Sequence, residues 1–210
     1  SYGGDSSSVS SQLSSGVTKI LSSNLAFAAL KDDGSVITWG YSSYGGDSSS
    51  VSSQLSSGVT EIFNNNTTFV ALKDDGSVIT WGNSSSGGDS SSVSSQLSSG
   101  VTEIFSTYYA FAALKDDGSV ITWGNSSYGG DSSSVSSQLS SGVTEIFSNN
   151  NAFAALKDDG SVITWGNSSY GGDSSSVSSQ LSSGVTKIFS NSLAFAALKD
   201  DGSVITWGYS

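Results

Sequence analysis

Short apolar runs recur along the chain at a fixed spacing of 42 residues, and Gly, Ser, Asn and Asp separate each run from the next. In one such stretch the runs occupy residues 59–63, 69–73 and 77–82, and they are rich in Val, Ile, Phe, Thr and Trp. Runs of this kind, bounded by turn-forming residues, predict β-strands. A weaker run at residues 93–97 predicts a fourth strand. No segment repeats apolar residues at helical spacing over three turns.

The apolar pattern also predicts how deeply each strand is buried. In the second strand Phe69 and Ala71 alternate with Val70 and Leu72, so both faces are apolar and must be covered. The serine-rich fourth strand belongs at the outer edge. A small four-stranded sheet, buried on both faces and repeated along the chain, is typical of a propeller blade. The prediction is an all-β fold of tandem four-stranded antiparallel β-blades, propeller-like, as a closed ring or an open superhelical or fibrous array.

An Asp-Gly pair lies between the second and third strands of every repeat. Asp75-Gly76 tolerates φ > 0 at both central positions of a type I′ turn, so we expect a hairpin with this turn. A β-helix, the main alternative, has no such hairpin inside its coils. We predict structural roles for the turn glycines and for the tryptophan that ends each third strand: Gly34, Gly76, Gly118, Gly160, Gly202, Trp39, Trp81, Trp123, Trp165 and Trp207.

The 210 residues divide into five ungapped repeats, and all five copies agree in 32 of the 42 columns. Eight of the ten variable columns fall in one stretch, residues 19–28 of the first repeat. The first and last repeats share Lys19/Lys187 and Tyr41/Tyr209, which suggests a longer period of four repeats in a recently amplified natural array. The predicted organisation is repeat 1 at 1–42, repeat 2 at 43–84, repeat 3 at 85–126, repeat 4 at 127–168 and repeat 5 at 169–210.

Composition removes several classes of function. With 57 Ser and 25 Gly but no Pro, Cys, Met or His, the chain offers no thiol or imidazole for catalysis or metal binding. Seven Lys, no Arg and 18 acidic residues give a net charge of −11, which opposes binding to nucleic acid and to anionic membranes. No apolar run approaches the roughly 20 residues of a membrane-spanning helix. We therefore expect no catalytic residue, no enzyme activity, no cofactor, no metal, no nucleic-acid partner and no membrane insertion.

The acidic motifs have structural explanations. Asp74 and Asp75 are adjacent and point in opposite directions on an extended chain, so they are not expected to form an acid/base pair. The sequence at residues 87–89, Gly-Gly-Asp, is similar to part of a calcium-binding repeat, but the full motif and the about 6–8 oxygen ligands of Ca²⁺ are missing. A Gly-Asp-Ser esterase motif would need a His to activate the Ser.

Asn-x-Ser/Thr sequences offer glycan attachment at several positions. Three of them recur in one column, directly after Trp-Gly, and are expected to carry glycans together or not at all. The repeated Trp could stack on a sugar ring, although packing at the end of a buried strand is favoured. The variable stretch is either a binding loop or a permissive one. The candidate N-glycosylation sites are Asn65, Asn66, Asn83, Asn125 and Asn167.

Residues 69–82, FVALKDDGSVITWG, resemble the repeat of the regulator of chromosome condensation family, VxxIxxGxxHTxALTxDGxVYxWGxNxxGQLG. The resemblance covers all five repeats and implies a propeller of four-stranded blades, typically about seven. The family's His and Gln-Leu-Gly are replaced, and the basic loops for nucleotide exchange and chromatin binding have no counterpart, so only the fold is carried over. The residues in register are Val59, Ile62, Ala71, Leu72, Asp75, Gly76, Val78, Trp81, Gly82 and Gly87.

Two functions fit these observations. The first is a non-catalytic structural repeat protein, a building block of an extracellular fibre or surface appendage, whose partners are other copies of itself and attached glycans. The alternative is a β-propeller scaffold that binds a glycan or a protein through its variable loops. The end repeats carry no polar cap, so an isolated monomer would expose their apolar residues. We expect an open, fibre-forming assembly outside the cell or at the cell surface.

Overall fold

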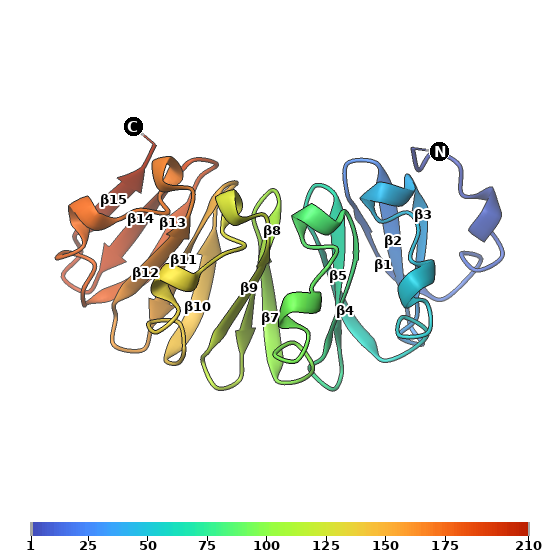
Figure 1. Ribbon diagram of the computed structural model, residues 1–210, viewed down its shortest axis with the longest axis horizontal. Helices are drawn as coiled ribbons and strands as arrows, with labels where there is room; N and C mark the ends of the chain where they lie inside the picture. Colours follow the sequence, from blue (N-terminus) through green and yellow to red (C-terminus); the bar gives the residue numbers. More distant parts are fainter. Residues whose placement is uncertain (1, 210) are drawn as a thin grey trace. The chain divides into compact units, whose positions relative to one another are not determined.

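The computed structural model describes residues 2–209, and this part of the chain is all-β, as predicted (Figure 1). Its strands form five antiparallel sheets, in the orders β1-β2-β3, β4-β5-β6, β7-β8-β9, β10-β11-β12 and β13-β14-β15. Contacts divide the chain into two compact units, one up to Ile104 and one from Phe105 onward. None of the helical segments in the described range has the length and hydropathy needed to cross a membrane.

The three strands of each sheet follow one another in the chain, and each sheet begins 42 residues after the last. They are Val17–Ser22 (β1), Ala26–Lys31 (β2), Val36–Gly40 (β3), Val59–Asn64 (β4), Thr68–Lys73 (β5), Val78–Gly82 (β6), Val101–Ser106 (β7), Ala110–Lys115 (β8), Val120–Gly124 (β9), Val143–Ser148 (β10), Ala152–Lys157 (β11), Val162–Gly166 (β12), Val185–Ser190 (β13), Ala194–Lys199 (β14) and Val204–Gly208 (β15).

The predicted fourth strand is wrong, because each blade has three strands. The segment before β7 forms a 3₁₀ turn at Ser91–Val93, and the amides of Gln96 and Leu97 then both donate to the Val93 carbonyl. The Asp89 carboxylate accepts a hydrogen bond from the Ser91 amide at 2.9 Å and starts this turn. Short polar side chains compete in this way for backbone groups, which favours turns over an extended strand.

Two 3₁₀ turns therefore form each linker between consecutive sheets. The first ends at a glycine with φ near +90 to +100°, such as Gly45 (φ 91°), and the second follows the Asp of Gly-Gly-Asp. These turns are Ser7–Val9 (η1), Ser42–Tyr44 (η2), Ser49–Val51 (η3), Ser84–Ser86 (η4), Ser91–Val93 (η5), Ser126–Tyr128 (η6), Ser133–Val135 (η7), Ser168–Tyr170 (η8) and Ser175–Val177 (η9).

The hairpin between the second and third strands is present, but its turn is not type I′. In β5 and β6 the register pairs Leu72 with Val78, and the Gly76 amide donates to the Lys73 carbonyl at 3.0 Å. Gly76 has φ +74°, whereas no non-glycine residue in the described range has positive φ. A type I′ turn needs positive φ at both central residues, so Asp75 and Gly76 do not form one. The loop has three residues, with Gly76 in the left-handed bulge position that follows a type I turn.

Candidate binding surfaces

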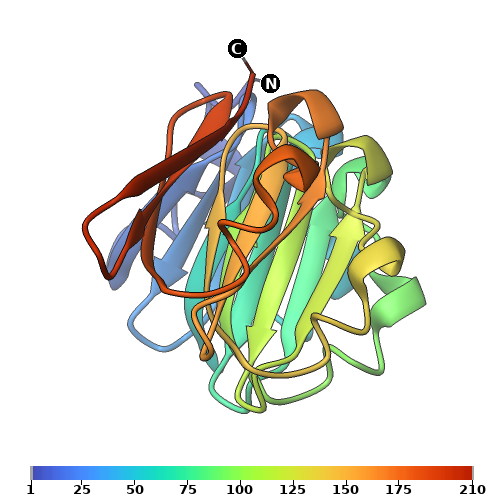
Figure 2. The same ribbon diagram turned by 90° about the vertical axis from the view of Figure 1, so that its left-hand side faces the viewer.

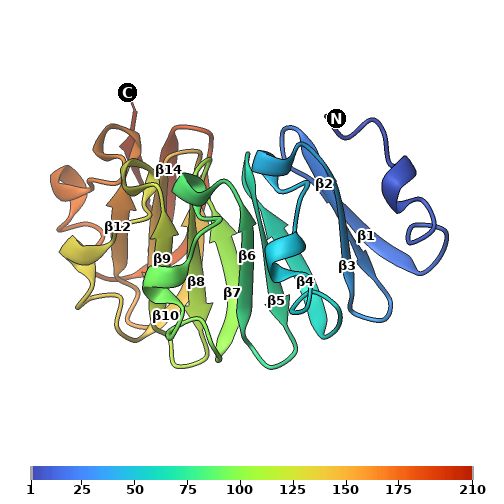
Figure 3. The same ribbon diagram turned by 45° about the vertical axis from the view of Figure 1, so that its right-hand side comes forward.

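Within each unit the hydrophobic core lies between consecutive sheets, at contacts that we call joints. In the first unit, β1–β3 and β4–β6 lie side by side (Figure 3). We call the face that a sheet turns toward the next repeat its C-side face, and the opposite face its N-side face. The C-side face of the first sheet contributes Ala26, Ala28, Leu30 and Val36 to the cluster that the two sheets share. The N-side face of the second sheet contributes Leu55, Val59, Ile62, Phe69, Ala71 and Trp81. The clusters of the second unit repeat this arrangement, with Ala152, Ala154, Leu156 and Val162 against Leu181, Val185, Ile188, Phe195, Ala197 and Trp207 in one of them.

Two backbone hydrogen bonds join the same two sheets at their outer corner. The Val59 amide donates to the Gly34 carbonyl at 3.0 Å, and the Val36 amide donates to the Leu55 carbonyl at 2.9 Å. A Cβ on Gly34 would lie 2.8 Å from the Gly58 nitrogen. Two features therefore favour glycine at this position of the hairpin: its positive φ, and the backbone of the next repeat, which leaves no room for a Cβ.

One column of the variable stretch makes the same hydrogen bond with different side chains. Ser23 Oγ donates to the Tyr44 carbonyl at 2.8 Å, and Asn65 Nδ2 donates to the Ser86 carbonyl at 2.8 Å. In the second unit Thr107 and Asn149 donate to the carbonyls of residues 128 and 170. Variation at this column is therefore limited to side chains that can donate. The sequence pattern gave no sign of this restriction.

The terminal sheets expose the faces that interior joints bury. Ile20 on the N-side face of the first sheet is 57 % exposed, whereas Ile62, one repeat later, is 1 % exposed. Val204 on the C-side face of the last sheet is 59 % exposed, whereas Val36 is 7 % exposed. Phe189 on the same last face is 52 % exposed. Figure 2 views the chain from the side of this last sheet, drawn in dark red.

The C-side face of the last sheet contains an apolar hollow of about 290 Å³. Phe189 and Ala196 line it, together with Ala194, Phe195 and Thr206. In the first sheet the corresponding Ala26 and Ala28 belong to the cluster completed by the second sheet. The hollow therefore lies where an N-side face packs at interior joints.

Tyrosine rings stack beside the first and last sheets. Tyr41 lies between Tyr2, at a centroid distance of 5.9 Å, and Tyr44, at 5.5 Å. In the second unit Tyr209 stacks on Tyr170 at 5.4 Å. Tyr209 is 60 % exposed and Tyr2 is 74 % exposed. Both rings therefore keep large areas accessible to a partner.

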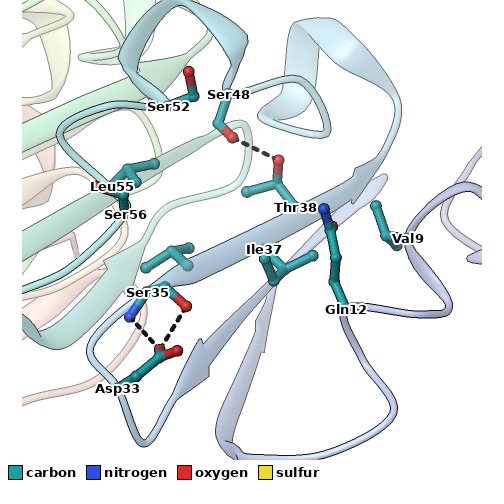
Figure 4. A pocket seen from close by; sticks show the side chains of 11 residues that line it. Val9, Gln12, Asp33, Ser35, Ile37, Thr38, Ser48, Ser52, Leu55 and Ser56 are labelled. Atoms are coloured by element: carbon teal, nitrogen blue, oxygen red, sulfur yellow. Dashed lines mark hydrogen bonds between the residues drawn. The ribbon is translucent and has the colours of Figure 1, made fainter.

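A polar groove recurs in both units. In the first unit it has a volume of about 410 Å³ and runs along β3, between the linkers that carry Gln12 and Ser48 (Figure 4). Thr38 Oγ1 and Ser48 Oγ lie 2.9 Å apart in its wall, and Ile37 lines its base. In the second unit a groove of about 450 Å³ is lined by residues that include Gln138, Ile163, Thr164, Ser174 and Ser178, the counterparts of Gln12, Ile37, Thr38, Ser48 and Ser52.

The carboxylates of the repeat act within turns. Asp33 accepts hydrogen bonds from Ser35 Oγ at 2.6 Å and from the Ser35 amide at 2.9 Å, and these bonds lower the pKa of its carboxyl. The Ser91 amide and hydroxyl lower the pKa of Asp89 in the linker. Across residues 2–209 no three acidic side chains gather in a way that would hold a metal ion.

Four of the five tryptophans are buried, and Trp39, on the N-side face of the first sheet, is half-buried. Trp81 is 2 % exposed, stacks on Phe69 at 5.6 Å, and donates from Nε1 to the Gly45 carbonyl at 3.0 Å. Trp39 makes the corresponding bond to Gly3 at 3.1 Å. Trp123 and Trp165 are 2 % exposed and Trp207 is 6 % exposed. The four buried rings are therefore not accessible platforms for a sugar.

The candidate glycosylation sites have different surroundings. Asn65 is 5 % exposed and its Nδ2 is hydrogen-bonded, so a glycan there would displace a bond of the joint. Asn66 is half-buried. Asn125 and Asn167 are half-buried, and their Oδ1 atoms accept from the amides two residues later. Asn83 Oδ1 accepts from the Ser85 hydroxyl at 2.7 Å.

Neither a protein-family model nor a curated protein sequence matches the chain. Solved structures do match it. Prp20p of Saccharomyces cerevisiae, the yeast RCC1, matches with a TM-score of 0.54 and 15 % identity, over 91 % of this chain and 57 % of that one. Human WBSCR16 matches with a TM-score of 0.52 and 20 % identity, over 91 % and 61 %. The ectodomain of the Physcomitrella patens receptor kinase CR4 matches with a TM-score of 0.50 and 14 % identity, over 92 % and 49 %.

These matches show the fold. The described residues form an RCC1-like propeller repeat structure, in agreement with the resemblance seen in the sequence. The chain spans between 49 % and 61 % of the length of these three proteins.

Proposed function

We propose that this RCC1-like repeat chain is a non-catalytic structural scaffold whose copies join head to tail through their terminal sheets. The observation that carries the proposal is the exposure of Ile20 and Val204, at 57 % and 59 %, beside 1 % and 7 % for their interior counterparts Ile62 and Val36. Burying an aliphatic or aromatic side chain of this size stabilises by about 1.5–3 kcal/mol. Covering these faces is therefore a substantial driving force for association.

The two terminal faces match each other because the clusters described within each unit pair the same types of residue. The N-side face of the first sheet carries Leu13, Val17, Ile20, Phe27, Ala29 and Trp39, identical in type to the six residues that the second sheet presents to the first. The C-side face of the last sheet carries Ala194, Ala196, Leu198 and Val204, identical to the four on the other side of that joint. A second copy therefore fits by the same packing.

Backbone groups and tyrosines would complete the contact. In an interior joint the residues equivalent to Val204 and Leu13 form one hydrogen bond, and those equivalent to Val17 and Gly202 form another. By the same correspondence, Tyr209 would lie between its own Tyr170 and Tyr2 of the second copy, as Tyr41 lies between Tyr2 and Tyr44. An interface of this kind is heterologous, so it produces a filament unless the rotation closes a ring. Placement of the assembly outside the cell stays a prediction from the sequence.

Sedimentation velocity over a range of micromolar concentrations tests the proposal. We expect the unmodified chain to associate, and we expect Val204→Asp and Ile20→Asp each to abolish association because they place a charge in a face that must become buried. Ser126→Asp adds the same charge at an exposed linker residue and is the matched control. A single monomeric species at all concentrations, the same in all four proteins, would contradict the proposal and favour a chain that closes on itself.

The second candidate function is binding of a neutral polar ligand, a glycan or an extended peptide, in the repeated groove. Its support is the recurrence of the same hydroxyl and amide lining in both units. Prp20p, a protein of this fold, binds Gsp1p and histones. Titration with neutral oligosaccharides should shift the amide NMR signals of Thr38 and Thr164 together. Unchanged signals at both residues would remove this candidate.

A further inference from the structure

One ion pair crosses a joint in the first unit. Lys19 Nζ lies 3.0 Å from Glu61 Oε1, and the two side chains are 46 % and 47 % exposed. The two residues occupy the same column of the repeat, one repeat apart. The joint therefore places neighbouring members of this column within ion-pair distance.

The column does not alternate in charge along the chain. It has lysine in the first and last repeats and glutamate in the middle three: Lys19, Glu61, Glu103, Glu145 and Lys187. When the C-side face of one copy receives the N-side face of another, Lys187 takes the place of Lys19, and Lys19 of the second copy takes the place of Glu61. We infer that two lysines face each other at the joint between copies and limit its strength. This inference rests on the proposed head-to-tail assembly.

The Lys187 ammonium group lies beside the exposed C-side face of the last sheet. Its Nζ lies 5.2 Å from the centroid of the Phe189 ring, and Phe189 is 52 % exposed on the C-side face of the last sheet. In interior joints the counterparts Leu21 and Phe147 pack against the core shared with the next sheet. Association would therefore cover Phe189 and bring a second lysine toward the ammonium group above it.

Two electrostatic effects oppose association, and salt alone does not separate them. The net charge of −11 repels two copies at long range, and the lysine pair repels them locally. Charge reversal does separate them. Lys187→Glu changes the net charge from −11 to −13, because it removes one positive charge and adds one negative charge. It increases the long-range repulsion but places a glutamate opposite Lys19.

The experiment compares association constants at low ionic strength for the unmodified chain, Lys187→Glu, Lys19→Glu and the double variant. Replacing a like pair by an opposite pair at an exposed position should tighten association about three- to tenfold, so each single variant should bind more tightly. The double variant places Glu opposite Glu and should return to about the unmodified value. Lys157→Glu, which makes the same change in net charge within an interior repeat, should bind no more tightly than the unmodified chain.

The outcomes distinguish this inference from the proposed function. If Val204→Asp abolishes association but Lys187→Glu leaves it unchanged or weakens it, the joint stands and the lysine inference is wrong. If Lys187→Glu and Lys157→Glu tighten association equally, the effect does not come from a facing pair and the inference is also wrong. If every protein remains monomeric, both the assembly and the lysine pair are overturned.

Discussion

Interior and terminal sheets of this chain carry nearly the same residues in different surroundings. Gly76 has the backbone of Gly100 against it, with a Cβ-to-nitrogen distance of 2.7 Å, whereas no atom lies within 4 Å of the same point at Gly202. Ile62 is 1 % exposed and Ile20 is 57 % exposed. The difference shows that burial in this fold is a property of the joint between two sheets and not of one sheet alone. A repeat without a neighbour keeps its strands but exposes its core.

The largest expected effect comes from a turn glycine in an interior joint. Gly76→Val should destabilise by about 2–6 kcal/mol, because the φ of +74° strains a β-branched residue and the side chain overlaps the next repeat. Gly202→Val meets only the strain, at φ +84°, and should cost about 1–3 kcal/mol. Urea unfolding midpoints of the two variants measure the difference. Equal midpoints would contradict the role of the joint.

The second comparison uses one isoleucine column. Ile62→Ala should destabilise by about 2–5 kcal/mol because it leaves a cavity in a closed core. Ile20→Ala should cost less than about 1 kcal/mol in the separate chain, since the side chain is already half exposed. Thermal unfolding below the association threshold gives both values. A large loss for Ile20→Ala would indicate that its face is covered in the unassociated protein.

A third test concerns the tyrosine stack. Tyr209→Asn gives the last repeat the residue that the middle repeats carry, and it should weaken association about two- to tenfold, as expected for loss of one aromatic pair. Tyr128→Ser removes an aromatic pair with Tyr109 inside the second unit and gives the residue that the third repeat carries in this column; it is the control and should leave the association constant within about twofold. Sedimentation equilibrium of both variants provides the comparison. The same weakening in both would place the effect outside the terminal face.

Acidification should produce the smallest difference between interior and terminal sheets. The pKa values of Asp33 and Asp201 are lowered from 3.8 by hydrogen bonds from Ser35 and Ser203, and both carboxylates are fully exposed. Because the folded pKa lies below the unfolded value, the stabilisation is complete above pH 3.8 and is lost as the pH falls through the folded pKa. Replacing Asp33 or Asp201 by Asn should therefore flatten the fall in unfolding midpoint below pH 3.8 by equal amounts. Unequal changes would show that the turn itself depends on a neighbour.

The sequence predicted the strands that depend on side-chain burial. The apolar runs of β4, β5 and β6 were identified as strands because β-forming residues alternate between two faces. Few other secondary structures fit that pattern. The segment 93–97 was predicted as a strand from its spaced apolar residues. There the hydrogen bonds of Asp89 and the local preference of serine decide the structure.

The surfaces were predictable to different degrees. Exposed terminal faces follow from a repeat that has no cap, so they were expected from the sequence. The polar groove was missed because it is formed by linkers about 40 residues apart, here those carrying Gln12 and Ser52, and only the packing of the fold brings them together. The turn type was missed because Asp75 tolerates two hairpin geometries, and the register of β5 with β6 selects between them.

The sameness of the joints has a consequence for how such a gene can change. Tandem coding units that are nearly identical gain and lose whole copies by unequal recombination. In this chain the addition of one 42-residue unit of the common type would add one more joint with the same apolar residues, because all repeats but the second, which has Thr68 and Val70 in place of two alanines, carry the same core residues on both faces. A change in the number of repeats between the first and the last would therefore leave the residues of the two outermost faces unchanged.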